Sequence, residues 1–460
     1  MPNPEIDNPT VVADAMPGPL ICALNGALLK TDLAAERTLH KVKNALDTLM
    51  SSRIDLQRIE LERADTTVSD FEVPVNEEVL NFLSQEKSKG RHIVLDTTET
   101  AESLSEILAD KSLFDEITDL TNTTLPEKFD YIGGKRTSKK LWEQATDKFL
   151  VGPSTETPQG FSGHFTSTSF SFKKLIKAIR AYQWLKNLLV FVPVITSQQL
   201  SNPNALKSAL IMFCCFSAVA SLGYIFNDLL DLQSDRAHPT KRNRPFASGA
   251  LSAQHGMLIG GCLLLIAVVG CFFLPTPAAW ALAGYLALTL GYSTYLKTKL
   301  MLDVVCLGGL FTLRVIGGAA AIQSDLSFYL LIFSIFLFSS LGMVKRFAEL
   351  HNLQIANKLS ARGRGYRVED MAPVRIIGIS LGYMSVFIMG LYINSPLITE
   401  YYSNPKVIWF LIPLLTYWLG RLWIIANRGE VHEDPLIFAL KDSTSLLVAA
   451  ISAVILVIAN

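Results

Sequence analysis

The sequence predicts two joined parts: an all-α transmembrane bundle of nine helices and, before it, a soluble α/β domain. Of 41 acidic and 41 basic residues, residues 1–170 hold 28 acidic and 17 basic ones, which leaves 13 and 24 for residues 171–460. The second part also contains apolar runs of about 18 residues or more, long enough to cross the hydrocarbon core of a bilayer as helices. We therefore expect an integral membrane protein whose membrane domain covers residues 171–460.

Nine apolar runs follow residue 171, and each predicts one helix. They lie near residues 183–198, 205–226, 256–274, 277–294, 303–323, 327–344, 373–393, 405–424 and 436–459. Basic residues gather in the loops after the even-numbered runs, such as Arg236 after the second and Lys297 after the fourth. Since lysine and arginine are enriched in cytoplasmic loops, the N-terminal domain is predicted to be cytoplasmic. The C-terminus is predicted on the outer side of the cytoplasmic (inner) membrane of the cell envelope.

Residues 17–150 alternate short apolar strands with helical stretches, which predicts a parallel sheet flanked by helices. Strands are expected at 20–24, at 91–98 and in the stretch ending in Phe-Asp-Tyr-Ile-Gly-Gly, and helices near 35–50, 75–89 and 101–109. Residues 1–16 are predicted to be disordered. Residues 151–170 are rich in Ser, Thr, Gly and Pro and are predicted to form a linker.

The strongest chemical signal follows the second apolar run, in the stretch YIFNDLLDLQSDRAHPTKRNRP at 224–245. Asp228, Asp231 and Asp235 are three and four residues apart, so on a helix their carboxylates project within roughly a 60° arc. Such like charges repel one another unless a cation lies between them, and hard oxygen ligands suit Mg²⁺. We therefore predict that the three aspartates bind Mg²⁺, with Asn227 beside them. The alternative is a solvated helix end.

This motif, Asn-Asp-x-x-Asp-x-x-x-Asp after the second run, resembles that of the UbiA superfamily of membrane prenyltransferases. The resemblance covers residues 171–460. It implies that the three aspartates hold Mg²⁺ and the pyrophosphate of a donor, in a helical cavity open to the cytoplasm. Members that prenylate aromatic acceptors usually carry another Asp-rich motif after the sixth helix, where this sequence has Lys345, Arg346 and Glu349. Fixed cations bind phosphate without a second metal.

The segments KRFAEL, RGRGY, LDVVCLGGLFTLRVIGGAAA and EDPLIFALKDSTS resemble one branch in particular, the polyprenyl-phosphate (decaprenyl-phosphate) phosphoribosyltransferases. That resemblance implies a Mg²⁺-dependent transfer of 5-phosphoribose from phosphoribosyl pyrophosphate to a polyprenyl phosphate, with release of pyrophosphate. The lipid phosphate is already an anion at neutral pH and needs no general base. Substrate contacts are then expected from Asn227, Lys241, Arg242, Arg244, Tyr295, Lys297, Asp303, Arg314, Lys345, Arg346, Glu349, Arg362, Arg364 and Tyr366.

The N-terminal domain resembles the Rossmann-like fold of haloacid dehalogenase (HAD) phosphatases, on the stretch PLICALNGALLKTD at 19–32. In that family the first strand ends in Asp-x-Asp-Gly-Thr, whose first Asp is the nucleophile and whose second is the acid or base. Aligned on Asn-Gly, those positions here hold Ala23 and Asn25, which cannot do this chemistry. Thr97 keeps a second-strand hydroxyl, and Ser138 stands where the family has a metal-binding acid.

The HAD-like domain is therefore predicted to be catalytically inactive, a pseudophosphatase. Two nearby carboxylates, Asp32 and Asp96, are not expected to substitute, because neither is expected to lie at a strand tip. A role as a scaffold, as an oligomerisation domain or in binding a protein partner is expected instead.

Two other functions stay open. One is an ordinary UbiA-type prenyltransferase that moves a prenyl chain from a prenyl diphosphate to an aromatic or lipid acceptor. The other is a membrane binder or regulator without catalysis. The expected partners are polyprenyl phosphate and phosphoribosyl pyrophosphate as substrates and the lipids of the membrane, and no nucleic acid is expected.

Overall fold

The structure is a computed structural model of the 460-residue chain. It describes residues 18–51, 73–99, 104, 112–120, 125–134, 139–153, 159–167, 171–238, 240–357, 365–396, 398, 402–431 and 434–459. The predicted disordered residues 1–16, and also Ser138, Arg362 and Arg364, lie outside these ranges.

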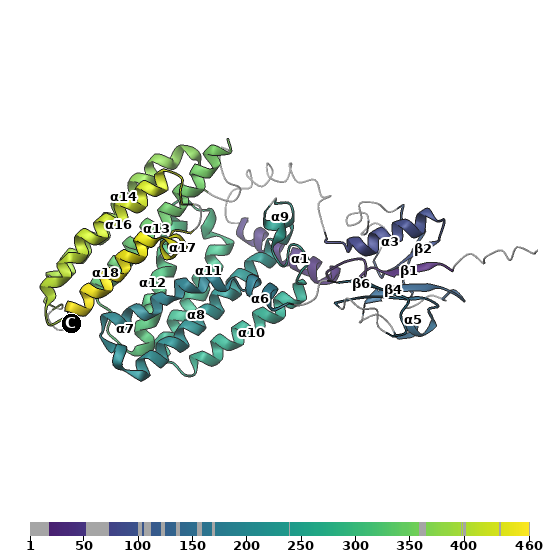
Figure 1. Ribbon diagram of the computed structural model, residues 1–460, viewed down its shortest axis with the longest axis horizontal. Helices are drawn as coiled ribbons and strands as arrows, with labels where there is room; N and C mark the ends of the chain where they lie inside the picture. The colour runs from purple at the N-terminus through teal and green to yellow at the C-terminus, as the bar shows by residue number, and fades with distance from the viewer. Residues whose placement is uncertain are drawn as a thin grey trace, which may run out of the picture. The chain divides into compact units, whose positions relative to one another are not determined.

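The chain divides into two compact units, whose elements are labelled in Figure 1. The first, the α/β unit, comprises Met1–Leu175 together with Asp228–Gly256. The second, the helical unit, comprises Ile176–Asn227 and Met257–Asn460. A domain boundary at residue 171 therefore does not describe the division completely, because the aspartate-rich stretch belongs to the compact unit of the N-terminal domain.

A six-stranded parallel sheet forms the centre of the α/β unit, in the order β3-β2-β1-β4-β5-β6. The strands are β1 (Leu20–Ala23), β2 (Ile93–Asp96), β3 (Glu116–Thr118), β4 (Asp130–Gly134), β5 (Lys148–Gly152) and β6 (Gly163–Thr166). The central strands are short apolar runs because a parallel sheet with helices on both faces buries successive side chains on either side. The predicted parallel sheet is confirmed.

Helices α3 (Glu77–Ser88) and α5 (Lys139–Gln144) cover opposite faces of this sheet (Figure 1). Phe82 of α3 packs against Phe149 of β5, with ring centroids 5.2 Å apart. On the other face Trp142 of α5 meets Tyr131 of β4 at 5.0 Å. A further helix, α1 (Leu33–Ser51), begins after Asp32, whose Oδ1 accepts a hydrogen bond from the backbone N of Ala35. The predicted helix near 101–109 lies almost entirely outside the described residues.

Residues 151–170 are not a linker throughout, contrary to the sequence-based expectation. Their first two residues complete β5, and Gly163–Thr166 form β6, which pairs in parallel with β5. The small polar residues of this stretch obscured a short strand at the edge of the sheet, where only Phe165 contributes a large apolar side chain.

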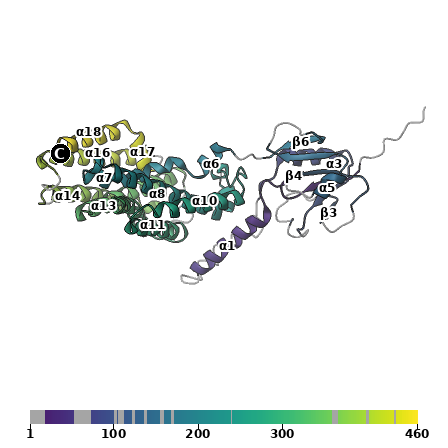
Figure 2. The ribbon, with the colours of Figure 1, turned by 90° about the horizontal axis from the view of Figure 1, so that it is seen from below.

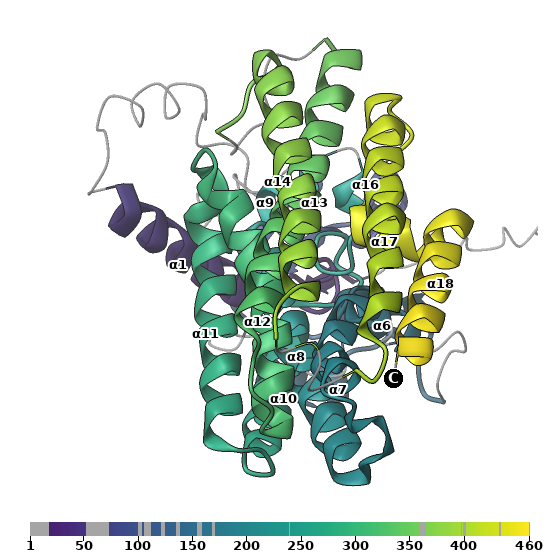
Figure 3. The same ribbon diagram turned by 90° about the vertical axis from the view of Figure 1, so that its left-hand side faces the viewer.

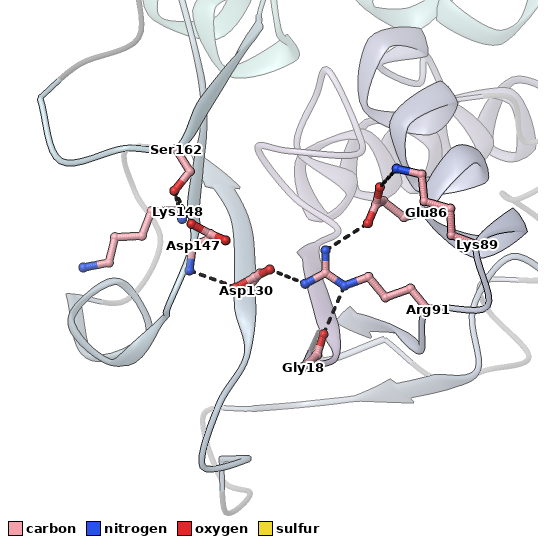
Figure 4. A network of polar contacts seen from close by, with 8 residues as sticks. All are labelled: Gly18, Glu86, Lys89, Arg91, Asp130, Asp147, Lys148 and Ser162. Carbon is pink, nitrogen blue, oxygen red and sulfur yellow. Dashed lines mark hydrogen bonds and ion pairs between the residues drawn. The ribbon is translucent and has the colours of Figure 1, made fainter. Parts of the chain in front are cut away.

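Buried charges fasten the amino ends of the strands (Figure 4). Arg91, just before β2, donates to the carbonyl of Gly18 at 3.0 Å, to Glu86 at 3.0 Å and to Asp130. Asp130 in turn accepts a hydrogen bond from the backbone N of Asp147 at 2.8 Å. Ligands of parallel sheets bind beyond the carboxyl ends of the strands, so this network at the opposite edge supports the fold.

The helical unit contains the membrane-crossing helices (Figures 2 and 3). Its longer elements are η1 (Ala181–Phe191), α8 (Pro203–Leu230), α10 (Ala253–Cys271), α11 (Thr276–Thr294), α12 (Leu302–Ile322), α13 (Phe328–Ile355), α14 (Met371–Ile393), α16 (Leu411–Asn427) and α18 (Ser443–Ala459). The shorter ones are α6 (Phe172–Ala178), α7 (Val192–Thr196), η2 (Gln199–Ser201), η4 (Leu296–Thr298), η5 (Val368–Asp370), η6 (Pro405–Phe410) and α17 (Pro435–Lys441). Of the described helices, α8, α10, α12, α13, α14 with η5, and α16 with η6 are long and apolar enough to cross a membrane.

The predicted count of nine spans is not confirmed. The run at 183–198 forms η1 and the short helix α7 rather than one long helix. Helix α11 contains Pro, Thr, Gly and Tyr, and it is not among the described helices that are apolar enough to cross a membrane. In the last run α17 and α18 are bent by 81°, and they make a seventh span only if counted together. At this bend Asp442 pairs with Arg421 at 2.7 and 3.0 Å.

Candidate active site

The aspartate-rich stretch lies where α8 ends. Asp228 is in the last turn of α8, Asp231 follows it in a turn, and Asp235 is in the five-residue helix α9 (Leu232–Arg236). Asp228 and Asp235 are buried, each with 2% of its surface exposed. Because the chain leaves α8 before Asp231, the three aspartates do not share the face of one continuous helix, contrary to the expectation.

Two of the three carboxylates converge on a single cation. Nη1 of Arg244 lies 2.6 Å from Oδ2 of Asp235 and 3.1 Å from Oδ1 of Asp228. The carboxylate of Asp231 is held differently, 3.8 Å from Nζ of Lys43 in α1. The structure therefore brings Asp228, Asp235 and Arg244 together, and it places Asp231 beside the N-terminal domain.

The Asp228–Asp235 pair fits a magnesium ion. Nowhere in the described ranges do three or more His, Cys, Asp or Glu side chains form a group that could hold a metal. Mg²⁺ is, however, commonly bound by one or two carboxylates, and it completes its shell with water and substrate phosphates. Two carboxylates that share one guanidinium nitrogen are close enough to share such an ion if Arg244 turns away. The Arg244 side chain is 27% exposed, so solvent lies next to it.

Arg346 and Asp303 form a buried ion pair in the helical unit. Nε of Arg346 in α13 lies 2.8 Å from Oδ2 of Asp303 in α12, and their side chains are 1% and 0% exposed. Arg346 also bonds Glu349, and it donates to the hydroxyl of Tyr292 at 3.2 Å. The predicted residues Asp303, Arg346 and Glu349 are thus gathered, but the positive charge of Arg346 is already neutralised by carboxylates.

Tyr366 joins this pair from the stretch before η5. Its hydroxyl donates to Oδ1 of Asp303 at 2.9 Å and accepts from the backbone N of Met301 at 3.1 Å. Burial, together with the neighbouring Asp303 carboxylate, raises the pKa of Tyr366 well above its usual value. The hydroxyl therefore stays protonated and keeps donating to Asp303.

Two lysines meet one aspartate in a second charged cluster. Oδ2 of Asp434 lies 2.6 Å from Nζ of Lys186 in η1 and 3.5 Å from Nζ of Lys345 in α13. Burial alone raises the pKa of Asp434, but the two lysines together hold it below its usual value. With two cations and one anion, the cluster Lys186–Lys345–Asp434 has an excess positive charge, which suits a phosphate.

Sequence reasoning found Lys345 but missed Lys186 and Asp434. A signal for each is present in the sequence. Lys186 is a lone lysine within the apolar stretch WLKNLLVFV, and Asp434 precedes Pro435, which is typical of a residue that caps a helix. The backbone N of Leu436 donates to Asp434 at 3.2 Å, as such a cap requires.

The guanidinium of Arg314 donates hydrogen bonds to three neighbouring residues within the helical unit. It donates to Oδ1 of Asn187 at 2.7 Å, to the carbonyl of Leu310 at 2.6 Å and to the hydroxyl of Tyr285 at 2.7 Å. Its exposed fraction is 5%. These contacts fasten η1 and α11 to α12, so the geometry favours a structural task over the predicted substrate contact.

The remaining predicted residues lie in less buried places. Lys241 and Arg242, in the short helix η3 (Lys241–Asn243), are exposed. Tyr295 and Lys297 are half-buried at η4, and Asn227 is half-buried in α8, one residue before Asp228.

The carboxyl edge of the sheet carries the positions expected to be degenerate. Ala23 ends β1 and is buried, while Oδ1 of Asn25 accepts a hydrogen bond from the backbone N of Leu33, the first residue of α1. Thr97 follows β2, and its hydroxyl accepts from the backbone N of Glu99. Asn25 therefore helps to begin α1.

Asp96 is the last residue of β2 and pairs in register with Ala23. The expectation that it would not lie at a strand tip is wrong. Its carboxylate accepts hydrogen bonds from the backbone N of Leu120 at 3.2 Å and from the hydroxyl of Tyr131 at 3.3 Å. Burial raises the pKa of Asp96.

A family model and several known proteins resemble this chain, one of them over almost its full length. The model of the UbiA prenyltransferase family matches residues 188–441. Uncharacterized protein y4nM of Sinorhizobium fredii is 32% identical over 472 residues, which cover 95% of this chain and 90% of that protein. The decaprenyl-phosphate phosphoribosyltransferase of Mycolicibacterium smegmatis is 34% identical over 281 residues, 58% of this chain and 86% of that protein. A UbiA homolog from Archaeoglobus fulgidus, solved bound to GPP and Mg²⁺, is 17% identical over 62% of this chain and 99% of that chain, with a TM-score of 0.48.

Proposed function

Because this chain belongs to the UbiA prenyltransferase family, we propose that it transfers 5-phosphoribose from phosphoribosyl pyrophosphate to a polyprenyl phosphate and releases pyrophosphate. The choice of substrates is supported by the M. smegmatis relative, which is named a decaprenyl-phosphate phosphoribosyltransferase. The reaction takes place in the membrane, which fits the six long apolar helices among the described residues.

One observation carries the proposal: Asp228 and Asp235 are buried and converge on the same nitrogen of Arg244. Two carboxylates held around one cationic centre are suited to a magnesium–pyrophosphate donor. When bound there, Mg²⁺ would neutralise charge on the departing pyrophosphate. Asp228 and Asp235 would supply its protein oxygens, with Asp231 and Asn227 next to them in the sequence. Arg244, released from the carboxylates, becomes available to a phosphate oxygen.

The acceptor needs little chemical help from the protein. A phosphate monoester carries at least one negative charge at neutral pH, so no side chain has to remove a proton before its oxygen attacks ribose C1. The bond from C1 to the pyrophosphate oxygen breaks, and a bond from C1 to the lipid phosphate oxygen forms. The protein's task is to position the two substrates and to neutralise their charge. In the helical unit, the excess positive charge of the cluster Lys186–Lys345–Asp434 is suited to holding a substrate phosphate.

The N-terminal domain is proposed to be a HAD-like domain without phosphatase activity. Ala23 has no nucleophilic atom, and the side chain of Asn25 is engaged at the start of α1. Asp96 lies at a strand tip, but its two hydrogen bonds hold it within the domain. The cytoplasmic placement of this domain and the outer placement of the C-terminus are part of the same proposal and follow from the basic loops.

The test is a transfer assay with the purified protein in detergent or nanodiscs. It contains Mg²⁺, phosphoribosyl pyrophosphate labelled in the ribose, and a polyprenyl phosphate. Label is expected to enter the lipid phase. Asp228→Asn is expected to lower the rate about 100-fold or more, because it removes a charged ligand next to the leaving group. Asp325→Asn, at an exposed aspartate between α12 and α13, is the matched control and is expected to retain activity.

Two outcomes would contradict the proposal. If no label reaches any polyprenyl phosphate, the chain is not a phosphoribosyltransferase. If instead a prenyl diphosphate donates its chain to an aromatic or lipid acceptor and phosphoribosyl pyrophosphate is inert, the chain is an ordinary prenyltransferase of the same family.

A further inference from the structure

Side chains of helix α1 in the N-terminal domain contact the stretch that carries the aspartates. Both belong to the same compact unit, which joins residues 228–256 to the α/β domain. In Figure 1 the short helix α9 lies beside α1. The stretch from Asp228 to Gly256, called here the aspartate loop, therefore has a folded partner in the domain whose catalytic residues are absent.

The central contact is a buried, two-pronged ion pair between Glu36 and Arg236. Nη1 of Arg236 donates to Oε2 of Glu36 at 2.8 Å, and Nη2 donates to Oε1 at 2.7 Å. The two side chains are 5% and 2% exposed. Nε of Arg236 donates at 3.1 Å to the carbonyl of Ala247, further along the aspartate loop. The guanidinium of Arg236 in α9 thus contacts both Glu36 of α1 and the backbone at Ala247, further along the aspartate loop.

Other contacts occur along the same helix. Oδ2 of Asp32, before α1, accepts from Nε2 of Gln254 at 3.0 Å, and Lys43 lies 3.8 Å from Asp231. Glu36 and Lys43 are seven residues apart in α1, a spacing that puts them on one face of the helix, and Asp32 directly precedes it. Gly249, with φ of +71°, is packed so closely that an added Cβ would lie 2.8 Å from Pro74.

Helix α9 cannot hold its own conformation. A helix of five residues is far below the length at which isolated helices are stable, so its shape must come from tertiary contacts. Arg236, the last residue of α9, directly follows Asp235, whose carboxylate meets Arg244. Fixing Arg236 therefore fixes the place of Asp235.

We propose that Glu36 is a positioning residue: through Arg236 it holds the aspartate loop in the conformation in which Asp228 and Asp235 converge. This inference rests on the proposed function for its effect on the donor. It gives the N-terminal domain a task that needs none of the missing catalytic groups. The N-terminal domain thus stabilises, within the same chain, the loop conformation of the aspartates that are proposed to bind the donor.

The experiment compares Glu36→Gln with Glu99→Gln in the full-length protein. Glu99 pairs with Arg37, the next residue of α1, and is the matched control because that ion pair does not involve the aspartate loop. Hydrogen exchange is followed without substrates, on peptides from 228–256 and on peptides from β1, β2 and β4. In parallel, KM is measured for phosphoribosyl pyrophosphate and for the polyprenyl phosphate.

Glu36→Gln is expected to speed exchange in the aspartate loop about tenfold or more, because it leaves the buried Arg236 charge unbalanced. Exchange in the strands is expected to stay unchanged. KM for phosphoribosyl pyrophosphate is expected to rise about tenfold, while KM for the lipid stays constant, since only donor binding depends on the loop. Glu99→Gln is expected to change neither the exchange in the aspartate loop nor the KM for phosphoribosyl pyrophosphate.

Unchanged exchange in the loop would overturn the proposal, and so would equal acceleration in loop and strands, because that would indicate general loss of the domain. If Glu36→Gln does not fold, Gln254→Ala, which removes the exposed contact with Asp32 just before α1, must also speed exchange in the aspartate loop and not in the strands, by a smaller factor. Since exchange needs no substrate, absence of transfer in the wild type would contradict only the proposed function. Normal transfer with an unchanged donor KM in Glu36→Gln would contradict only the positioning.

Discussion

Two charged clusters of the helical unit differ in how their charges add up. Around Arg346, the carboxylates of Asp303 and Glu349 balance or exceed the single positive charge, and the Asp303–Arg346 pair is almost fully buried. Around Asp434, two lysines face one carboxylate, and the Lys345 side chain is 33% exposed. The number of cations in a stretch therefore does not identify a phosphate site. The carboxylates that other elements contribute decide whether any positive charge is left for a ligand.

The comparison assigns different tasks to two neighbouring residues of α13. Arg346 faces a buried carboxylate and holds α13 to α12. Lys345 shares its carboxylate with Lys186 and has an exposed side. Replacing each in turn separates stability from binding.

The largest effect is expected from Arg346→Met. It leaves Asp303 buried without its cation, and breaking a buried pair in this way costs about 3–5 kcal/mol in the free energy of unfolding. The measurement is unfolding by SDS titration in mixed micelles. Arg428→Met, at an exposed arginine after α16, is the control and is expected to change little.

A double variant sharpens this test. Replacing both partners, in Asp303→Leu with Arg346→Met, is expected to recover most of the lost stability, because no charge is then left unpaired. If Arg346→Met alone is as stable as the wild type, the ion pairs of Arg346 with Asp303 and Glu349 are not what holds α12 and α13 together.

Lys345→Met is expected to change binding rather than stability. A charge-assisted hydrogen bond contributes about 1.5–3 kcal/mol, so the KM of one phosphorylated substrate should rise about 10- to 100-fold. The free energy of unfolding should change by less than about 1 kcal/mol, because the side chain is partly exposed and Lys186 still neutralises Asp434. Lys345→Arg, which keeps the charge, should retain most of the affinity. Unchanged KM values for both substrates would show that the excess charge of this cluster is not used for binding.

The sequence predicts the elements of the fold better than it predicts what the charged side chains contact. Apolar runs and alternation were sufficient for the central strands and the parallel sheet. The spacing of Asp228, Asp231 and Asp235 predicted one shared helix face, but α8 ends before Asp231. The partners are set by tertiary packing: Lys186 and Asp434 are 248 residues apart in the chain, and Asn187 and Arg314 are 127 apart. No local pattern links positions at such separations. For the same reason the partnership of Glu36 with Arg236 emerges only from the fold.

Tyr366→Phe tests how much the hydrogen bond from Tyr366 to Asp303 contributes to stability, and its effect is expected to be smaller than that of Arg346→Met. It removes the hydrogen bond that the hydroxyl donates to Asp303 and leaves the Arg346 pair in place. The expected loss is about 1–2 kcal/mol in the free energy of unfolding. KM values should stay close to those of the wild type. A rise in the KM of either substrate, with stability intact, would instead place Tyr366 in contact with substrate.

Acid titration tests the charge of the cluster Lys186–Lys345–Asp434 through the sign of the change in stability with pH. The two lysines hold the pKa of Asp434 below its usual value, so its folded state binds a proton less readily than its unfolded state does. The stabilisation is therefore fully present above the unfolded value of about 3.9 and is lost as the pH falls through the lower folded value. Thermal unfolding of the wild type and of Asp434→Asn should differ at pH 7, with the wild type more stable, and the difference should shrink below about pH 4. Asp325→Asn corrects for the general effect of acid. A difference that persists undiminished at the lowest pH would mean that Asp434 contributes through packing, and the charge excess assigned to its cluster would then be wrong.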